Sequence, residues 1–321
     1  MNRREFVARA AASLPIALPG FLSAEQLPVP RTYTYKKAGG CVLKADVYGA
    51  SFTVKKPVIF WIHGGALIFG TRRYIEAPRL GELFLSNGYA LVSIDYRLAP
   101  ETKLSAIIKD VQDAYRWVHE LGPRLFNIDP GRLAVAGGSA GGYLALMAGF
   151  CVRPRPRALL SLSGYGDIDG PWYSQPSPHY LRHALVSKEE AFDSVVNGCV
   201  CETPEPNPRF RFYVYCRQQG LWPEEVTGRN PHTEPRWFDR YCPVRNVSAE
   251  YPPSVLIHGT ADTDVPHQES VDMDAKLSEF GVEHRFLSVP GGGHELDNGV
   301  APDVKEKIFE QGLAFIKAHT G

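Results

Sequence analysis

The segment that most constrains the fold is LAVAGGSAGG, at Leu133–Gly142. A short apolar run leads into a Gly-x-Ser-x-Gly pentad centred on Ser139, and a helix-forming stretch follows it. Glycines on both sides of a serine permit a sharp strand-to-helix turn that holds the hydroxyl clear of the backbone. The N-terminus of the following helix favours negative charge developing at the same point. The segment therefore predicts a nucleophile elbow with Ser139 as the nucleophile.

A second segment supplies hydrogen-bond donors for such a nucleophile. Pro57–Gly70, PVIFWIHGGALIFG, begins as a buried-strand run and continues into Gly64 and Gly65. Two glycines after a strand leave bare backbone amides that can face a tetrahedral oxyanion, and the amide of Ala140 adds another donor. We expect Gly64, Gly65 and Ala140 to form an oxyanion hole.

Two further segments supply an acid and a base. Asp262 lies just past a strand end in SVLIHGTADTDVP, and His294 lies in a glycine-rich loop after HRFLSVP. In a serine triad the histidine takes the serine proton, and the acid fixes the histidine tautomer and stabilises the imidazolium. We assign these roles to His294 and Asp262. Asp264, two residues further on, is the alternative acid.

Together with SIDYRLAPE at Ser93–Glu101, these motifs resemble the α/β-hydrolase esterases, near the carboxylesterase branch that includes hormone-sensitive-lipase-like and acetyl- or feruloyl-esterase-like enzymes. The resemblance covers Thr53–Tyr165 and Tyr251–Gly321. It implies a serine carboxylesterase that hydrolyses small to medium esters through an acyl-enzyme, with no cofactor and no metal. The partner it implies is a small-molecule ester.

Some details depart from, or add to, that pattern. Ala66 stands where relatives have a third glycine, and Gly138 stands where many carry an acid. We expect His63 to anchor the oxyanion loop by a hydrogen bond, and Asp95 and Arg97 to form a structural ion pair. His258, at a strand end, is expected to pack or bond locally.

The rest of the chain predicts an α/β fold, with a mostly parallel, doubly wound sheet and its site at the carboxyl ends of the strands. A chain of 321 residues with 44% hydrophobic content can bury one large core. An opening hairpin is expected at Thr32–Tyr48. The expected core strands are Pro57–Ile62, Ala90–Ile94, Leu133–Ala136, Ala158–Ser163, Ser254–His258 and Arg285–Val289. The expected helices include Leu104–Leu121, Pro266–Phe280 and Asp303–His319.

Residues 166–250 interrupt this alternation and are rich in proline and aromatic residues. We expect them to form a cap over the site, with aromatic side chains that line a pocket or fill the cap's own core. Its four cysteines allow one or two disulfides in three full pairings, and a zinc site is the alternative. The aromatic candidates are Trp172, Tyr173, Tyr180, Trp222, Trp237 and Phe238, and the cysteines are Cys199, Cys201, Cys216 and Cys242.

Residues 1–24, MNRREFVARAAASLPIALPGFLSA, resemble a twin-arginine export signal. Arg3 and Arg4 supply the positive region, a weakly apolar run follows, and a small-residue cleavage site ends at Ala24. The expected mature protein is a single domain over residues 25–321, in the periplasm or outside the cell. An ordinary amphipathic N-terminal helix is the alternative.

Charge and hydropathy exclude several partners. Lys and Arg total 35 and Asp and Glu total 35, which gives no electrostatic case for nucleic acid or anionic membrane. No 18-residue apolar stretch in the body could span a bilayer, so no stable membrane insertion is expected.

Three other functions stay open on the same core. A prolyl-oligopeptidase-type peptidase usually has a bulky aromatic residue where this chain has Ala140. Amide or lactone hydrolysis would use the same residues as ester hydrolysis. A non-catalytic binding protein would be expected to have lost a triad member, and Ser139, Asp262 and His294 are all present. The sequence does not specify the natural ester or the oligomeric state.

Overall fold

The computed structural model describes residues 27–321, in which one eight-stranded sheet runs in the order β1-β2-β4-β3-β5-β6-β7-β8. The strands β3 to β8 are mutually parallel, whereas β2 pairs antiparallel with both β1 and β4. The expected α/β fold with a mostly parallel sheet is confirmed. The strands are β1 (Arg31–Ala38), β2 (Cys41–Tyr48), β3 (Lys56–Ile62), β4 (Ala90–Ile94), β5 (Ile128–Gly138), β6 (Ala158–Leu162), β7 (Ser254–Gly259) and β8 (His284–Val289).

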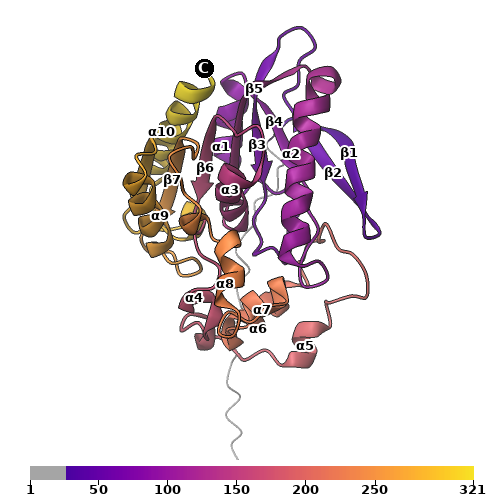
Figure 1. Cartoon of the computed structure of the whole chain (residues 1–321), viewed down its shortest axis with the longest axis vertical. Helices are drawn as coiled ribbons and strands as arrows, with labels where there is room; N and C mark the ends of the chain where they lie inside the picture. Colours follow the sequence, from indigo (N-terminus) through magenta and orange to yellow (C-terminus); the bar gives the residue numbers. More distant parts are fainter. Residues whose placement is uncertain (1–26) are drawn as a thin grey trace, which may run out of the picture.

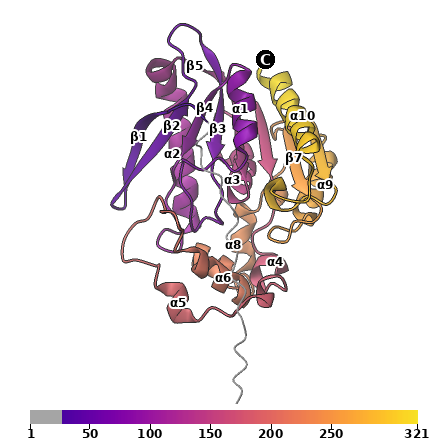
Figure 2. The ribbon, with the colours of Figure 1, turned by 180° about the vertical axis from the view of Figure 1, so that it is seen from behind.

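Helices cover both faces of the sheet (Figures 1 and 2). On one face, α1 (Pro78–Ser86) and α10 (Pro302–Thr320) pack on alternate strand residues such as Trp61. The opposite face is covered by α2 (Leu104–Phe126), α3 (Ala140–Cys151) and α9 (Gln268–Glu279), which pack on residues such as Phe60. Central strands that are buried on both faces explain the near-continuous apolar runs in the sequence.

One helix differs from its expected length. The helix α2 continues past Leu121 through Gly122 and Pro123 to Phe126. A Cβ on Gly122 would lie 2.9 Å from Ile128, the first residue of β5. This glycine therefore permits close packing of the helix on Ile128, and the helix does not end there. The extra turn is stabilised because it buries Phe126 in the core.

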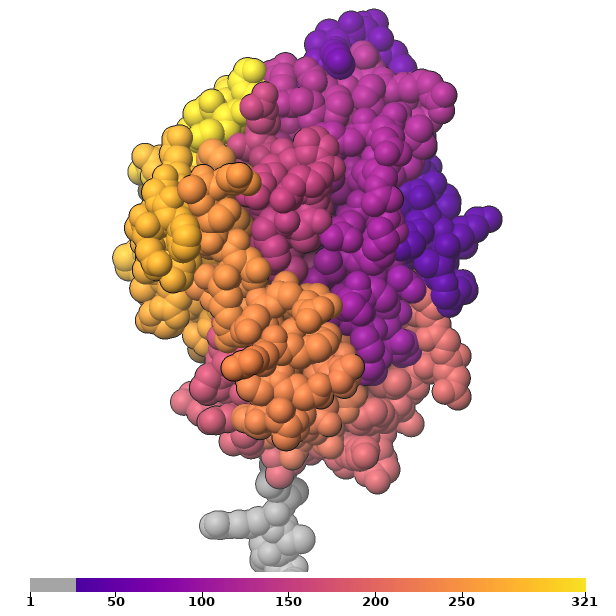
Figure 3. All heavy atoms as spheres, in the orientation of Figure 1, coloured from indigo at the N-terminus to yellow at the C-terminus, as the bar shows by residue number. Residues whose placement is uncertain are grey.

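Residues 166–250, which we call the insertion, connect β6 to β7 and contain only helical elements. They lie across the carboxyl ends of the parallel strands, and Figure 3 shows them as a continuous pink-to-orange surface closing that end of the molecule. The insertion has its own aromatic core, in which Tyr173 stacks on Trp172 and Trp222 with ring centroids 3.6 and 3.9 Å away. Its helices are α4 (Pro171–Ser174), α5 (Lys188–Phe192), α6 (Phe210–Gln219), α7 (Trp222–Thr227) and α8 (Pro235–Phe238), with single helical turns at Tyr180–Arg182, Asp239–Tyr241 and Pro243–Arg245.

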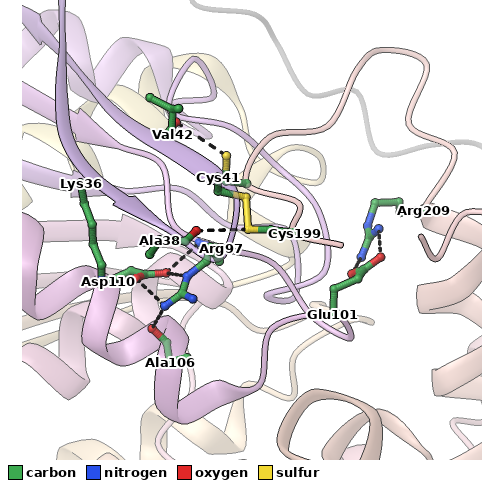
Figure 4. The surroundings of a disulfide bond; sticks show 11 residues. Lys36, Ala38, Cys41, Val42, Arg97, Glu101, Ala106, Asp110, Cys199 and Arg209 are labelled. Carbon is green, nitrogen blue, oxygen red and sulfur yellow. Dashed lines mark hydrogen bonds and ion pairs between the residues drawn. A yellow bond between two sulfur atoms is a disulfide. The ribbon is translucent and has the colours of Figure 1, made fainter. Parts of the chain in front are cut away.

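A disulfide joins the insertion to the opening hairpin (Figure 4). Cys199 bonds to Cys41, 158 residues earlier in the chain, with their Cα atoms 5.7 Å apart. The expectation of pairing within the insertion is therefore wrong for Cys199, because the insertion passes along the end of β2. Cys201, Cys216 and Cys242 are free thiols.

A buried ion pair forms a second attachment, also drawn in Figure 4. The Arg209 guanidinium donates to both carboxylate oxygens of Glu101, and each side chain is only 3% exposed. Arg209 also donates to the carbonyl oxygens of Ile68, Ala99 and Ser194. One insertion side chain thereby holds the loops that follow β3 and β4.

We predict that Glu101→Gln lowers the free energy of unfolding by about 3–5 kcal/mol, because it leaves the buried Arg209 without its counter-charge. Urea denaturation followed by tryptophan fluorescence measures this. The matched control is Glu250→Gln, which removes a carboxylate from the exposed pair with Arg155 and should cost less than about 1 kcal/mol. Equal losses in the two variants would contradict the prediction.

Candidate active site

Ser139 occupies a strained turn between β5 and α3. Its backbone angles are φ 52° and ψ −120°, and its amide donates to the Leu162 carbonyl at 2.8 Å. A Cβ on Gly141 would lie 1.9 Å from the Ile62 carbonyl oxygen, so only glycine permits this approach of α3 to β3. The turn presents the Ser139 side chain to a cavity.

The Asp262 carboxylate accepts four hydrogen bonds. One carboxylate oxygen accepts from His294 Nδ1 at 2.7 Å and from His258 Nε2 at 3.1 Å. The other accepts from the amides of Asp264 and Val265 at 2.8 and 2.9 Å. Burial raises the pKa of Asp262, but the two histidines and these hydrogen bonds outweigh it and hold that pKa well below its usual range.

His258 bonds locally as expected, and one of its partners, four residues on, is Asp262. Its Nε2 faces two acceptors, Asp262 and the Val265 carbonyl, so this nitrogen carries the proton. Its Nδ1 then accepts from the Ser270 hydroxyl at 2.7 Å. The strand-end histidine therefore helps to hold the carboxylate oxygen that also binds His294.

His294 presents its second ring nitrogen to the cavity. Because Nδ1–H donates to Asp262, the unprotonated nitrogen of the neutral ring is Nε2. Burial lowers the pKa of His294, but Asp262, followed by Asp264 and Glu295, outweighs it and raises that pKa to about 10. Within residues 27–321, no hydrogen bond joins the Ser139 hydroxyl to His294, although both side chains line the same cavity.

Asp264, the alternative acid, lies beside the other nitrogen of the histidine. Its Oδ2 is 3.7 Å from His294 Nε2, whereas Asp262 occupies Nδ1. Asp262, and not Asp264, is therefore the acid bound to Nδ1 in this structure. Oδ1 of Asp264 accepts from the Tyr180 hydroxyl, the Tyr213 hydroxyl and Arg217 Nη1 at 2.9, 2.5 and 2.8 Å.

The three expected oxyanion donors differ in availability. The amide of Gly64 donates to the carboxyl group of Glu76. In contrast, the amides of Gly65 and Ala140 have no hydrogen-bond partner in the part of the chain that the structure describes. Ala66, in place of the third glycine, adopts φ 54°, and its carbonyl accepts from Trp222 of the insertion at 3.0 Å.

Two half-buried glutamates that the sequence analysis did not identify lie beside the elbow. A Cβ on Gly138 would lie 2.6 Å from Oε1 of Glu295 and 3.1 Å from Cβ of Glu76. Glu295 thus occupies the space over Gly138 where an acidic side chain at that position would begin. Burial, partly offset by His294, raises the pKa of Glu295 to about 7, and burial together with Glu295 raises the pKa of Glu76.

His63 stabilises the oxyanion loop as expected. Its Nδ1 donates to the Gly64 carbonyl at 2.8 Å, and its ring stacks on Tyr96 at 4.2 Å. Burial outweighs that hydrogen bond and lowers the pKa of His63 to about 4.

The expected ion pair between Asp95 and Arg97 is not formed. Asp95 pairs with the buried Arg72 at 2.9 Å, whereas Arg97 pairs with Asp110 of α2 at 2.7 Å. Each partner comes from a segment distant in sequence, which spacing within one motif does not reveal.

A cavity of about 470 Å³ extends from Ser139 to the insertion on one side and to α10 on the other. Of the six aromatic candidates in the insertion, Tyr180 lines it, and Tyr173, Trp222 and Phe238 are buried in the insertion core. The aromatic lining is completed by residues the sequence analysis did not single out, which are Phe69, Phe210, Tyr213 and Phe309.

Two family models match different parts of the chain. That of BD-FAE matches residues 45–156, and that of the prolyl oligopeptidase family matches residues 210–321. The first contains the oxyanion loop and the elbow, and the second contains the acid and the histidine.

Among the described residues, no helix has the length and apolar character needed to cross a membrane.

The curated relatives are much larger proteins. The chain is 30% identical to the non-reducing polyketide synthase Preu6 of Preussia isomera over 332 residues, which is 92% of this chain and 15% of that protein. It is 29% identical to Preu3 of the same organism, over 83% of this chain and 12% of that protein. The chain thus spans only a small part of these relatives.

Solved structures share the fold. An α/β hydrolase superfamily protein from Enterococcus faecalis superposes with a TM-score of 0.69 at 23% identity, covering 90% of this chain and 99% of that one. A thermophilic esterase from Thermogutta terrifontis gives 0.62 at 19% identity, covering 91% and 92%. A truncated carbohydrate esterase from gut microbiota gives 0.61 at 21% identity, covering 91% and 97%.

We predict that the His294 imidazole titrates well above the ordinary histidine pKa of about 6.5, toward 10, because Asp262 and Asp264 stabilise its charged form. NMR titration of the ring protons measures this. Asp264→Asn should lower the pKa of His294, whereas His63 in the same spectrum should remain neutral from pH 5 upward. A His294 pKa at or below 6.5 would show that burial outweighs both carboxylates.

Proposed function

We propose that the chain, which has the α/β-hydrolase fold, is a serine hydrolase, and more specifically a carboxylesterase that cleaves small to medium esters through an acyl-enzyme. The observation that carries the proposal is the single cavity lined by both Ser139 and His294, with Asp262 bound to the histidine at 2.7 Å. Further support comes from esterases among the structural neighbours. No substrate of those neighbours is assigned to this chain.

The proposed reaction begins at the Ser139 hydroxyl group. Ser139 Oγ attacks the ester carbonyl carbon while His294 Nε2 accepts the hydroxyl proton. The carbonyl π bond opens to a tetrahedral oxyanion, and the amides of Gly65 and Ala140 donate to it. The intermediate collapses as the bond to the alcohol oxygen breaks, and Nε2–H protonates that oxygen. The alcohol leaves, and the acyl group stays on Ser139.

Water then repeats the sequence on the acyl-enzyme and releases the carboxylic acid. Asp262 stays ionised throughout and stabilises the imidazolium. Since His294 must be neutral to act as a base, its raised pKa places the rise of activity in the alkaline range. The Gly64 amide joins the oxyanion donors only when the Glu76 carboxyl group releases it.

Peptide hydrolysis is the second candidate, because the prolyl oligopeptidase family model matches residues 210–321. Ala140 argues against it, since the peptidases of this family usually have a bulky aromatic residue after the serine. Release of the amine from a proline-containing peptide, measured beside ester turnover, distinguishes the two activities.

We predict that Ser139→Ala abolishes hydrolysis of p-nitrophenyl esters, from acetate through palmitate, with kcat falling at least about 10⁴-fold. Labelling by a fluorophosphonate should disappear with it. The matched control is Ser161→Ala, which alters a buried serine at the end of the neighbouring strand and should keep both activities. Ester hydrolysis that persists in Ser139→Ala would overturn the serine mechanism.

We also propose that the protein is exported. The twin-arginine segment at residues 1–24, which lies outside the described residues, supports this proposal. The Cys41–Cys199 disulfide also supports it, because an oxidising compartment preserves such a bond.

We predict that the protein appears in the periplasmic fraction with an N-terminus near Glu25, as read by N-terminal sequencing. Arg3→Lys with Arg4→Lys should block export, whereas Arg9→Lys should not. An intact N-terminus on exported protein would contradict cleavage.

A further inference from the structure

One carboxylate oxygen in the cavity has no donor. Asp264 Oδ1 accepts three hydrogen bonds from the insertion, whereas Oδ2 receives none from any residue in the range 27–321. His294 Nε2 lies 3.7 Å from Oδ2. The Asp264 side chain is 21% exposed and lines the cavity that contains Ser139. A carboxylate fixed by three donors on one oxygen presents the other as a preorganised acceptor.

Arg217 decides which kind of donor this acceptor suits. Its guanidinium pairs with Asp264 at 2.8 Å, is only 3% exposed, and lies over four aromatic rings of the insertion. Arg217 offsets part of the Asp264 charge, and the rest stabilises the protonated His294 ring, which would repel a second cation beside Oδ2. A neutral hydroxyl group still gains a short hydrogen bond to the free oxygen.

The position of Oδ2 specifies which part of an ester would reach it. In the mechanism above, His294 Nε2 delivers its proton to the leaving alcohol oxygen, so that oxygen lies about 3 Å from Nε2. Two gauche oxygens on neighbouring carbons are about 2.8 Å apart, close to a hydrogen-bond length. With Oδ2 at 3.7 Å from Nε2, a vicinal hydroxyl can bind Asp264 while the ester oxygen faces His294.

The geometry points to a substrate class, and this inference rests on the proposed esterase function. The cavity is built for monoacyl esters of 1,2-diols, in which Asp264 Oδ2 accepts the hydroxyl group next to the scissile ester oxygen. Asp264 is in this respect a specificity residue for the alcohol portion. Aromatic walls from Phe69, Tyr180, Phe210 and Tyr213 suit either an aryl ring or the apolar face of a sugar ring behind that diol.

Two sets of matched esters test the inference. The aryl set is catechol monoacetate, 2-methoxyphenyl acetate and phenyl acetate. The aliphatic set is ethylene glycol monoacetate, 2-methoxyethyl acetate and propyl acetate. We predict that the wild type favours the hydroxyl member of at least one set by about 10-fold or more in kcat/KM over both other members. The set with the larger preference identifies the diol as aromatic or aliphatic.

Asp264→Asn should reduce that preference to about 1. Any effect of this variant on the pKa of His294 is common to all the esters of a set and cancels in their ratio. The matched control is Asp272→Asn, the same substitution at an exposed aspartate of α9 that does not line this cavity, and it should keep the preference. Because Asp264→Asn leaves Arg217 unpaired, the double variant with Arg217→Gln provides a charge-balanced version of the same test.

Each outcome has a separate meaning. A wild type that hydrolyses all members equally, or rejects only the methoxy members, overturns the inference whether or not the variants fold. A hydroxyl preference that survives in Asp264→Asn overturns it as well. If the wild type cleaves p-nitrophenyl esters but none of these six esters, the inference is overturned and the esterase function stands. If it cleaves neither kind of ester, the esterase function itself fails.

Discussion

The close contact between the end of β3 and the start of α3 is the constraint on which the rest of the site depends. At Gly141 the helix backbone comes so near the Ile62 carbonyl that no side chain fits between them. This contact fixes the turn at Ser139 beside the loop that follows β3, which carries Gly64 and Gly65. Ser139 and the amides of the loop after β3 are thus positioned by backbone packing, and little depends on flexible side chains.

Three carboxyl groups with different pKa shifts lie around that fixed point. Asp262 is held by four donors, and Glu76 and Glu295 lie on the other side of the elbow. The carboxylate that must stay ionised is saturated with hydrogen bonds, whereas burial raises the pKa values of Glu76 and Glu295. Burial raises the pKa of all three acids, and at Asp262 the neighbouring histidines outweigh it.

Much of this arrangement could be predicted from local sequence. The expected strand Ala90–Ile94 matches β4, and the other core strands match to within a few residues, because apolar runs bounded by glycine carry a strong signal. The elbow and the loops with Asp262 and His294 were found because their chemistry restricts residue type and spacing. The triad and oxyanion roles themselves remain predictions, since geometry alone does not test them.

Contacts between distant segments could not be predicted in the same way. Asp95 meets Arg72, Cys199 meets Cys41, and Glu295 fills the space above Gly138, each through packing that no local spacing encodes. The insertion shows this most clearly. Its prolines and aromatic residues marked it as a separate element, but Tyr180 and Phe210 became cavity walls while Trp222 became core.

The attachment of Asp264 to the insertion has a consequence for how such an enzyme diverges. Tyr180, Tyr213 and Arg217 all come from the insertion, yet they hold a carboxylate that faces the base of the core. Replacing the insertion by recombination would change the shape of the cavity and the electric field at His294 in one event. A change of insertion therefore alters the substrate range and the pH dependence of activity together. Laboratory evolution that grafts a new insertion would have to optimise both at once.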